Sequence, residues 1–160
     1  MAQQSKFKIF ATAILISLGV GVLSAFLTRG NMDVYKSVSA PPLSPPGILF
    51  PIVWTILYIL MGIGAGIVYL NKEISKEDAN AGLFNFGLSL FVNFFWSIFF
   101  FNLRAFLFSF IWLILLLYLI IRYTLFYKKV SLLAASLQIP YILWVLFAGY
   151  LNFGITLLNH

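Results

Sequence analysis

The sequence predicts an all-α membrane protein, a bundle of five transmembrane helices with a proline-rich loop between the first and second helices. Composition is one reason, because 62% of the 160 residues are hydrophobic and 9% are charged, whereas soluble domains carry roughly 25% charged residues. The other reason is that five apolar stretches are long enough to cross a hydrocarbon layer of about 30 Å as helices of about 20 residues. These stretches are residues 7–28, 48–70, 81–101, 105–127 and 131–158.

We expect the whole chain, residues 1–160, to form one integral membrane domain of continuous helices. A β-barrel would show short alternating segments rather than unbroken apolar runs, and a bilayer leaves the backbone of an open strand without partners. The first stretch follows Lys6 and Lys8 and is also compatible with a secretory signal. No small-x-small cleavage pattern stands at the end of the run, directly before Arg29, so a retained first helix is the preferred interpretation.

Prolines dominate the longest connection, residues 29–46, and recur near two helix starts. Proline fixes φ and biases the preceding residue toward extended geometry, so a helix is excluded around Pro41, Pro42, Pro45 and Pro46. Pro46 suits the first position of the second helix. Pro51 then lies either within the tolerated first turn or deeper, where it would leave a backbone carbonyl free. Pro140 is expected to kink or loosen the fifth helix.

Charge placement predicts the orientation of the chain in its membrane. Lysines and arginines lie near the ends of the apolar stretches, where they meet lipid headgroups. If the N-terminus is inside, Arg29, Lys36 and Arg104 are outside. The inner side then holds Lys6, Lys8, Lys72, Lys76, Arg122, Lys128 and Lys129. The positive-inside rule therefore favours an inner N-terminus, and the absence of a visible transit peptide favours the cell membrane of a prokaryote.

Several functions are disfavoured by the residues that the chain does not contain. No aspartate or glutamate lies centrally in an apolar stretch, which argues against proton-coupled transport, ion conduction and acid–base catalysis. There is no cysteine, and the only histidine, His160, is the last residue. We expect no metal site and no required cofactor. The net charge of +6 does not indicate nucleic-acid binding, because no basic patch with interleaved aromatic residues faces water.

Aromatic and amide side chains share faces of the predicted helices. These sets are Trp54, Tyr58 and Gly62; Ser89, Asn93, Trp96 and Phe100; and Tyr141, Trp144, Ala148 and Asn152. They are compatible with a pocket for a flat, largely apolar ligand or with plain helix packing. Small residues also recur every four positions in the first helix, at Ala13, Ser17, Gly21 and Ala25. The GxxxG pair Gly62 and Gly66 marks either a dimer face or packing within the chain.

A series of short motifs covers nearly the whole chain. In order they are Ser17-Leu18-Gly19, Tyr35, Pro41, Pro45-Pro46, Phe50-Pro51-Ile52-Val53-Trp54, Asn93-x2-Trp96-Ser97-x-Phe99-Phe100 and Pro140-Tyr141-x2-Trp144-x2-Phe147-Ala148-x2-Leu151-Asn152. In this order and spacing they resemble the TspO/MBR family, which includes translocator proteins, peripheral-type benzodiazepine receptors and tryptophan-rich sensory proteins. The sequence departs from the family pattern at Val34, Ala40, Leu43, Ser89 and Trp112. It also has no basic residue after Tyr150, so the cholesterol motif of the animal proteins is not reproduced.

The resemblance implies a five-helix bundle, often a homodimer, with a ligand pocket under the first loop. Family ligands are porphyrins such as protoporphyrin IX and heme, and benzodiazepine-type compounds. The residues implied to line the pocket are Trp54, Asn93, Trp96, Phe100, Trp144, Ala148 and Asn152, with Tyr35 and the lid prolines Pro41, Pro45 and Pro46 closing it. Propionates of a porphyrin are expected to reach Arg29, Lys36 or backbone N–H groups near the loop.

Three functions follow from this reading, and the first is preferred. It is a tetrapyrrole-binding sensor or carrier that does not change its ligand. The second is a light-dependent breakdown of porphyrin, with Trp54 and Trp144 as redox partners and no acid–base residue required. The third is a structural membrane subunit that binds a partner through its rows of small residues.

Overall fold

The structure, a computed structural model, describes residues 2–160 and is helical throughout its regular elements. Five helices are long and apolar enough to cross a membrane, as the sequence predicts, and residues 2–160 contain no strand. The elements are α1 (Ala2–Thr28), the 3-10 turn η1 (Arg29–Asn31), α2 (Val34–Ser37), α3 (Leu49–Leu70), α4 (Lys76–Ser97), the π-helical segment η2 (Ile98–Asn102), α5 (Phe106–Val130), α6 (Leu132–Ser136) and α7 (Ile139–Leu158).

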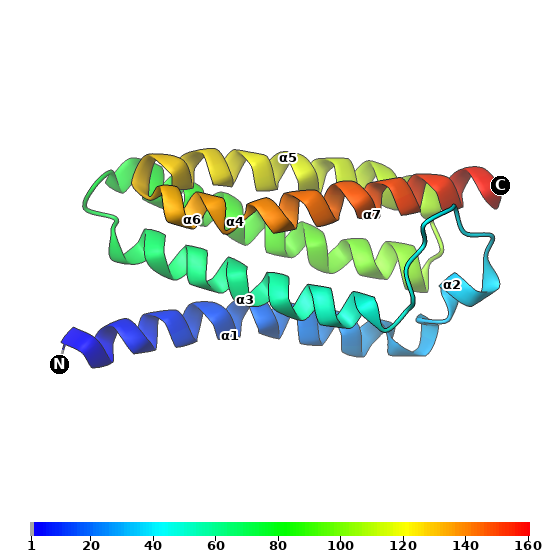
Figure 1. Cartoon of the computed structure of the whole chain (residues 1–160), viewed down its shortest axis with the longest axis horizontal. Coiled ribbons are helices and arrows are strands. Elements are labelled where there is room, and N and C mark those ends of the chain that lie inside the picture. Colours follow the sequence, from blue (N-terminus) through cyan, green and yellow to red (C-terminus); the bar gives the residue numbers. More distant parts are fainter. Residues whose placement is uncertain (1) are drawn as a thin grey trace.

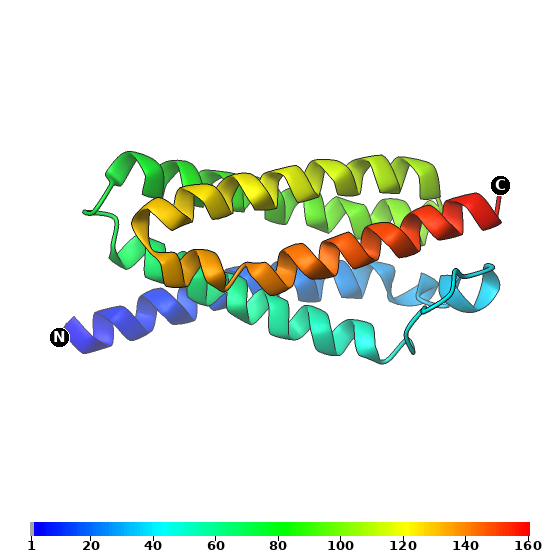
Figure 2. The same cartoon turned by 45° about the horizontal axis from the view of Figure 1, so that its top comes forward.

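The long helices run side by side along one axis, so the bundle has two distinct ends (Figure 1). At one end lie the start of α1, the α3–α4 connection and the α5–α6 connection; we call this the amino-terminal end. At the other lie α2, the connection from α2 to α3, the η2–α5 turn and the C-terminus, and we call this the loop end (Figures 1 and 2).

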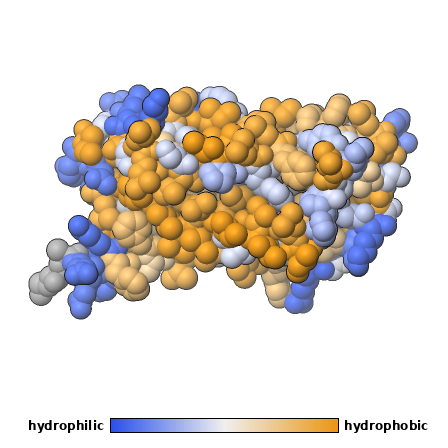
Figure 3. All heavy atoms as spheres, viewed as in Figure 1, coloured by the Kyte–Doolittle hydropathy of each residue, from blue (hydrophilic) through white to orange (hydrophobic). Residues whose placement is uncertain are grey.

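The face of the bundle shown in Figure 3 is mostly apolar in the middle and polar at both ends. Large side chains such as Leu15, Phe84 and Ile114 are more than half exposed on its outside, at 69%, 67% and 54%. Apolar area on this scale has to be removed from water, and soluble monomers rarely expose it. The chain is therefore a multi-pass integral membrane protein whose apolar belt meets lipid.

The helix starts differ from the predicted positions for local reasons. The expectation that Pro46 begins the second helix is wrong, because α3 begins at Leu49 after a turn in which the Leu49 N–H donates to the Pro46 carbonyl at 3.0 Å. Pro51 lies in the first turn of α3, where proline is tolerated. The Gly47 carbonyl is not left free, since it accepts from the Phe50 N–H at 3.4 Å.

Two other boundaries follow from capping and from proline. α4 begins at Lys76, five residues before the predicted stretch, because Ser75 caps it and accepts from the Asp78 N–H at 3.4 Å. The fifth apolar stretch is divided into α6 and α7, and Pro140 is the second residue of α7. This break is the loosening that the missing N–H of Pro140 predicts.

Close contact between α1 and α3 fills the middle of the bundle. A Cβ added to Gly62 would lie 2.5 Å from the Ile14 Cα, and one added to Gly66 would lie 2.6 Å from the Phe10 ring. The Ser17 hydroxyl donates to the Tyr58 carbonyl at 2.7 Å. The GxxxG pair therefore packs against α1 within the chain, which decides between the two alternatives that the sequence leaves open.

Candidate ligand-binding site

A cavity of about 100 Å³ lies at the loop end between α1, α2, α3 and α4. α1 contributes small side chains on one face, since Gly21, Ser24, Ala25 and Thr28 follow the i, i+3, i+4, i+7 pattern of a single helical stripe. Aromatic rings from the other helices form the facing walls. The complete lining is Gly21, Ser24, Ala25, Thr28, Met32, Tyr35, Phe50, Pro51, Trp54, Tyr58, Asn93, Trp96, Ser97 and Phe101.

Trp54 lies at the centre of the aromatic walls. Its ring centroid is 5.7 Å from that of Tyr58, 6.1 Å from that of Tyr141 and 6.4 Å from that of Trp96. Aromatic pairs attract each other at centroid separations of about 4.5–7 Å, so the rings hold one another in place. The cavity is therefore bounded by the faces and edges of positioned rings.

Tyr35 closes the cavity toward the loop end. Its ring stacks on Phe50 with a centroid distance of 5.0 Å and an interplanar angle of 17°. The same ring lies 5.6 Å from that of Phe100 and 6.0 Å from that of Phe101. The short helix α2 thus brings Tyr35 between the start of α3 and the segment η2, where it covers the cavity.

The buried amides near the cavity join helices to one another. The Asn93 amide donates to the Tyr141 hydroxyl at 2.9 Å, which connects α4 to α7. The Asn152 amide oxygen accepts from the Trp96 indole at 3.1 Å, and its NH₂ group donates to the Phe106 carbonyl at 2.8 Å. Asn152 therefore satisfies both ends of its amide within the bundle, as expected for an asparagine that packs helices in a membrane.

The structure divides the predicted pocket residues into two groups. Tyr35, Trp54, Asn93 and Trp96 line the cavity. The others lie behind its wall and do not line it: Phe100, Trp144, Ala148 and Asn152.

Each residue of the second group is buried or half-buried close to the wall. Phe100, in η2, stacks on Trp96 with a centroid distance of 5.5 Å, and Asn152 bonds the same indole. Trp144 meets Phe50 edge to face at 5.8 Å. Ala148 is buried on α7, one helical turn from Trp144 and from Asn152. A layer of one ring therefore separates α7 from the cavity.

Trp144 has a buried hydrogen-bond donor that is left without a partner. Its indole Nε1 is buried and has no hydrogen-bond partner within residues 2–160. A buried donor without a partner costs about 1–3 kcal/mol. The Trp144 ring packs against Phe50, which lines the cavity, so Trp144 lies one ring behind the cavity wall.

The lid prolines are placed differently from the expectation. None of Pro41, Pro45 and Pro46 lines the cavity, and Pro51 does. Residues 38–48 are non-helical and are bonded to α7 instead. The Tyr150 hydroxyl donates to the Pro42 carbonyl at 2.7 Å, and the Asn159 side chain exchanges bonds of 2.9 and 2.8 Å with the Ser39 backbone.

Several lining residues of the cavity were not predicted as site residues from the sequence. Phe50 and Pro51 stand in a quoted motif, and Gly21 and Ala25 in the row of small residues, but neither set was linked to a cavity. The usable signal was the stripe of small and hydroxyl residues on α1. Tyr58 stands on one of the aromatic faces predicted for a pocket, and the residues added by the structure are Gly21, Ser24, Ala25, Thr28, Met32, Phe50, Pro51, Ser97 and Phe101.

The chain is similar to known proteins along most of its length. A sequence profile of the TspO/MBR family matches residues 13–158. The tryptophan-rich protein TspO of Chlorobaculum tepidum is 37% identical over 150 residues, which cover 93% of this chain and 94% of that protein. The protein of the same name from Archaeoglobus fulgidus is 38% identical, with 92% and 94% covered. The translocator protein of Bos taurus is 32% identical, with 88% and 83% covered.

Proposed function

The chain belongs to the TspO/MBR family, and from this membership and the cavity we propose that it is a membrane sensor or carrier of tetrapyrroles such as protoporphyrin IX or heme. The observation that carries the proposal is the aromatic cavity at the loop end, bounded by Tyr35, Trp54 and Trp96. Aromatic faces bind flat apolar rings by stacking. The same walls suit benzodiazepine-type compounds.

Binding requires the loop end to open. The cavity holds about 100 Å³, whereas sites for drug-sized ligands hold about 300–1,000 Å³. The contacts to be broken are the stack of Tyr35 on Phe50, the contacts of the same ring with Phe100 and Phe101, and the bonds from Tyr150 and Asn159 to the loop. Displacement of Phe50 would also offer the ligand the unpartnered Trp144 N–H.

Cationic side chains at the loop end can pair with the propionates of a porphyrin. Arg29 lies over the Phe26 ring at 4.2 Å, and Lys36 pairs with Asp33 at 3.2 Å with both side chains more than four-fifths exposed. Exposed ion pairs of this kind are weak, so a propionate can replace Asp33 at low cost. A porphyrin would then have its ring among the aromatic side chains and its carboxylates at the membrane surface.

The test is a titration of protoporphyrin IX into the purified full chain in lipid nanodiscs, followed by porphyrin absorbance in the dark. We expect saturable binding that Trp54→Ala weakens at least about tenfold, because a wall ring is lost from a stacked site. Trp112→Ala is the matched control, since the Trp112 indole donates to the Val92 carbonyl at 2.6 Å and does not line the cavity. Equal affinities of the two variants, or a linear uptake equal to that of empty nanodiscs, would contradict the proposal.

A second arm examines the buried donor. Trp144→Phe removes the N–H and keeps most of the ring, so it isolates the hydrogen bond from the packing. We expect porphyrin to bind about three- to tenfold more weakly, as for the loss of one hydrogen bond, with the melting temperature unchanged or raised. Unchanged porphyrin affinity would show that the ligand does not reach α7.

A second candidate function is light-dependent porphyrin breakdown. The observation that favours it is the close series of oxidisable rings formed by Trp54, Trp96 and Tyr141. In this reaction an excited porphyrin would take one electron from Trp54 and pass it to dissolved dioxygen, which would form superoxide. Superoxide would add to the porphyrin ring, and the adduct would return one electron to the Trp54 radical cation, so that the net reaction joins porphyrin and dioxygen. The test is illumination of the complex in air. A new product absorbance that disappears in Trp54→Phe, which retains a stacking ring, supports this function, and bleaching at an equal rate in both proteins opposes it.

We propose a prokaryotic cell membrane with the N-terminus inside, on the basis of the cation distribution and the relatives in Chlorobaculum tepidum and Archaeoglobus fulgidus. Because the chain has no cysteine, single cysteines report the orientation directly. A membrane-impermeant maleimide applied to intact cells is expected to label Ser39→Cys and not Lys6→Cys. The reverse pattern would invert the orientation.

A further inference from the structure

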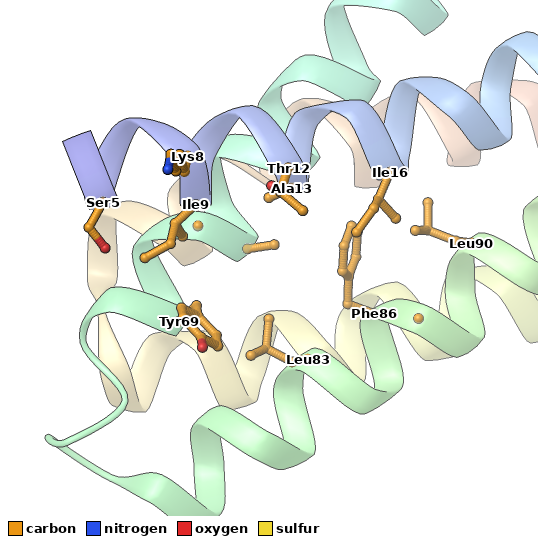
Figure 4. Close-up of a pocket in the computed structure, with 13 residues that line it drawn as sticks. Ser5, Lys8, Ile9, Thr12, Ala13, Ile16, Tyr69, Leu83, Phe86 and Leu90 are labelled. Carbon is orange, nitrogen blue, oxygen red and sulfur yellow. The ribbon is translucent and has the colours of Figure 1, made fainter.

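A second hollow lies at the amino-terminal end, away from the aromatic cavity. It is a groove of about 580 Å³ between α1, α3 and α4, within the range of about 300–1,000 Å³ that is usual for ligand sites. Figure 4 shows α1 along one side and α4 along the other, with Tyr69 of α3 at one end. None of its lining residues lines the aromatic cavity.

The walls of the groove are mostly aliphatic and its width comes from small residues. Ile9 and Ile16 of α1 face Leu83 and Leu90 of α4 across the hollow (Figure 4). Gly87 of α4 also lines it, and nothing lies within 4 Å of the place where a Gly87 Cβ would stand. Such a surface fits a flexible hydrocarbon chain rather than a rigid aromatic ligand.

The groove is open to the surroundings of the bundle. Ile16 is 56% exposed and Tyr69 is 46% exposed, although both lie on helices that span the membrane. Ile16, in the middle of α1, therefore faces lipid hydrocarbon, and Tyr69, beside the end of α3, lies near the headgroups. A lipid chain can thus enter from the side without crossing water.

Cations stand at the mouth of the groove. Lys8 lines it, and the Lys72 ammonium lies 4.6 Å from the centroid of the Tyr69 ring, which also lines it. The ion pairs within residues 2–160 are Lys36–Asp33 and Lys129–Asp78, so neither Lys8 nor Lys72 is paired in the part of the chain described. Unpaired lysines beside an apolar groove are complementary to an anionic group attached to a hydrocarbon chain.

We propose that this groove holds one acyl chain of an anionic phospholipid, with the lipid phosphate against Lys8 and Lys72. The amino-terminal end also carries Lys6, Lys76, Lys128 and Lys129, and lysines near a membrane surface attract anionic headgroups. The chain enters between α1 and α4, while the Ser5 and Tyr69 hydroxyls at the mouth can donate to phosphate oxygens. The site is independent of the proposed tetrapyrrole function, because it lies at the opposite end of the bundle.

The first experiment fills the groove. The full chain in detergent is titrated with phosphatidylglycerol or phosphatidylcholine, and bound lipids are counted by native mass spectrometry. Gly87→Trp is expected to remove the tightest phosphatidylglycerol adduct, because the indole would occupy the hollow without meeting another atom at its Cβ. Gly19→Trp is the matched control, since its Cβ position is equally empty and it does not line the groove.

The second experiment removes the charge at the mouth. Lys8→Gln is expected to weaken the phosphatidylglycerol adduct about fivefold, the equivalent of about 1 kcal/mol per lysine near a headgroup, and to leave phosphatidylcholine binding unchanged. Lys6→Gln makes the same change in charge two residues away, at a position that does not line the groove. Circular dichroism and melting curves show whether each variant is folded.

Three results would overturn the proposal. One is equal binding of the two lipids to the parent chain. Another is an equal loss of phosphatidylglycerol binding in Lys8→Gln and Lys6→Gln, which would indicate that the lipid responds to a diffuse surface potential instead of binding at a site. The third is retention of the phosphatidylglycerol adduct in Gly87→Trp; if that variant also shifts a dimer to monomer, the groove accommodates a second copy of the chain.

Discussion

At the loop end the helices close around a cavity of about 100 Å³ walled largely by aromatic rings, whereas at the amino-terminal end they part around a groove of about 580 Å³ walled mainly by aliphatic side chains, with Tyr69 and Phe86 as its aromatic residues. Hydrogen bonds and an ion pair join helices at both ends, since Asn152 bonds Trp96 and Phe106 at the loop end and Lys129 pairs with Asp78 at the amino-terminal end. The difference lies in α1, because at the loop end the Asn102 amide bonds the Leu27 carbonyl of α1 at 3.1 Å.

α1 changes its surroundings along its length. Ser17 bonds it to α3, and between Ser17 and the chain start the structure within residues 2–160 shows no side-chain hydrogen bond from α1 to α4. This part of α1 is held by apolar contact with Gly62 and Gly66 of α3. In a membrane, apolar contact with a helix and with lipid are similar in free energy, so α1 can stand away from α4 and leave room for lipid.

The largest effect on stability is expected at the contact between α1 and α3, two helices that contribute to both hollows. Gly62→Leu would push α1 from α3, because even its Cβ would lie 2.5 Å from the Ile14 backbone. We expect a loss of about 2–3 kcal/mol in the free energy of unfolding, as for overpacking, measured by denaturation in detergent. Gly19→Leu, which points into open space, is the control. Equal stability of both variants would mean that α1 is not closely packed on α3.

A smaller loss in the free energy of unfolding is expected when hydrogen bonds between helices at the loop end are removed. Asn152→Leu leaves the buried Trp96 N–H and the Phe106 carbonyl without their partner, which we expect to cost about 1–2 kcal/mol. Asn71→Leu removes an exposed bond of 2.8 Å within the end of α3 and should change stability by less than about 0.5 kcal/mol. Phosphatidylglycerol binding should persist in Asn152→Leu, and its loss would show that the two ends are coupled.

The rate at which a ligand enters the cavity should rise when the hydrogen bond between α7 and the loop is removed. Tyr150→Phe removes the donor to the Pro42 carbonyl, a partly exposed bond of about 0.5–1 kcal/mol. The expected result is about a threefold rise in the association rate of protoporphyrin IX, measured by stopped flow. Tyr118→Phe, whose hydroxyl accepts only from the neighbouring Arg122 at 2.8 Å, should associate at the parent rate. A slower rate in Tyr150→Phe would show that the loop does not limit entry.

The smallest effect is expected at a lysine of the amino-terminal end that already has a partner. Lys129 pairs with Asp78 at 3.0 Å on the surface, and exposed pairs contribute little. Lys129→Gln should leave both the melting temperature and the phosphatidylglycerol adduct unchanged, in contrast to Lys8→Gln. A loss of lipid comparable to that in Lys8→Gln would argue for net charge rather than for the groove.

The aromatic residues of the candidate site could be predicted from the sequence, because helical periodicity decides which residues share a face of a helix. Trp54 and Trp96 stand on the predicted faces and line the cavity. Trp144 and Asn152 share a face on α7 as predicted, yet they lie one layer behind the wall. The position of a residue on a helical face predicts whether it points into the bundle. Whether it also lines a cavity depends on which side chains of the neighbouring helices lie between it and the cavity.

The number of spans and their membrane setting were already decided by the amino-acid sequence, since a backbone in lipid has to satisfy its own hydrogen bonds and a helix of sufficient apolar length does so locally. The break between α6 and α7 near Pro140 likewise follows from the sequence, because it depends only on the missing N–H of that proline. The tertiary structure alone decided that Gly66 meets Phe10, that Asn152 bonds Trp96, and that α1 leaves a groove beside Gly87. These outcomes depend on the rotation and separation of helices far apart in the chain, which side-chain packing over the whole bundle sets.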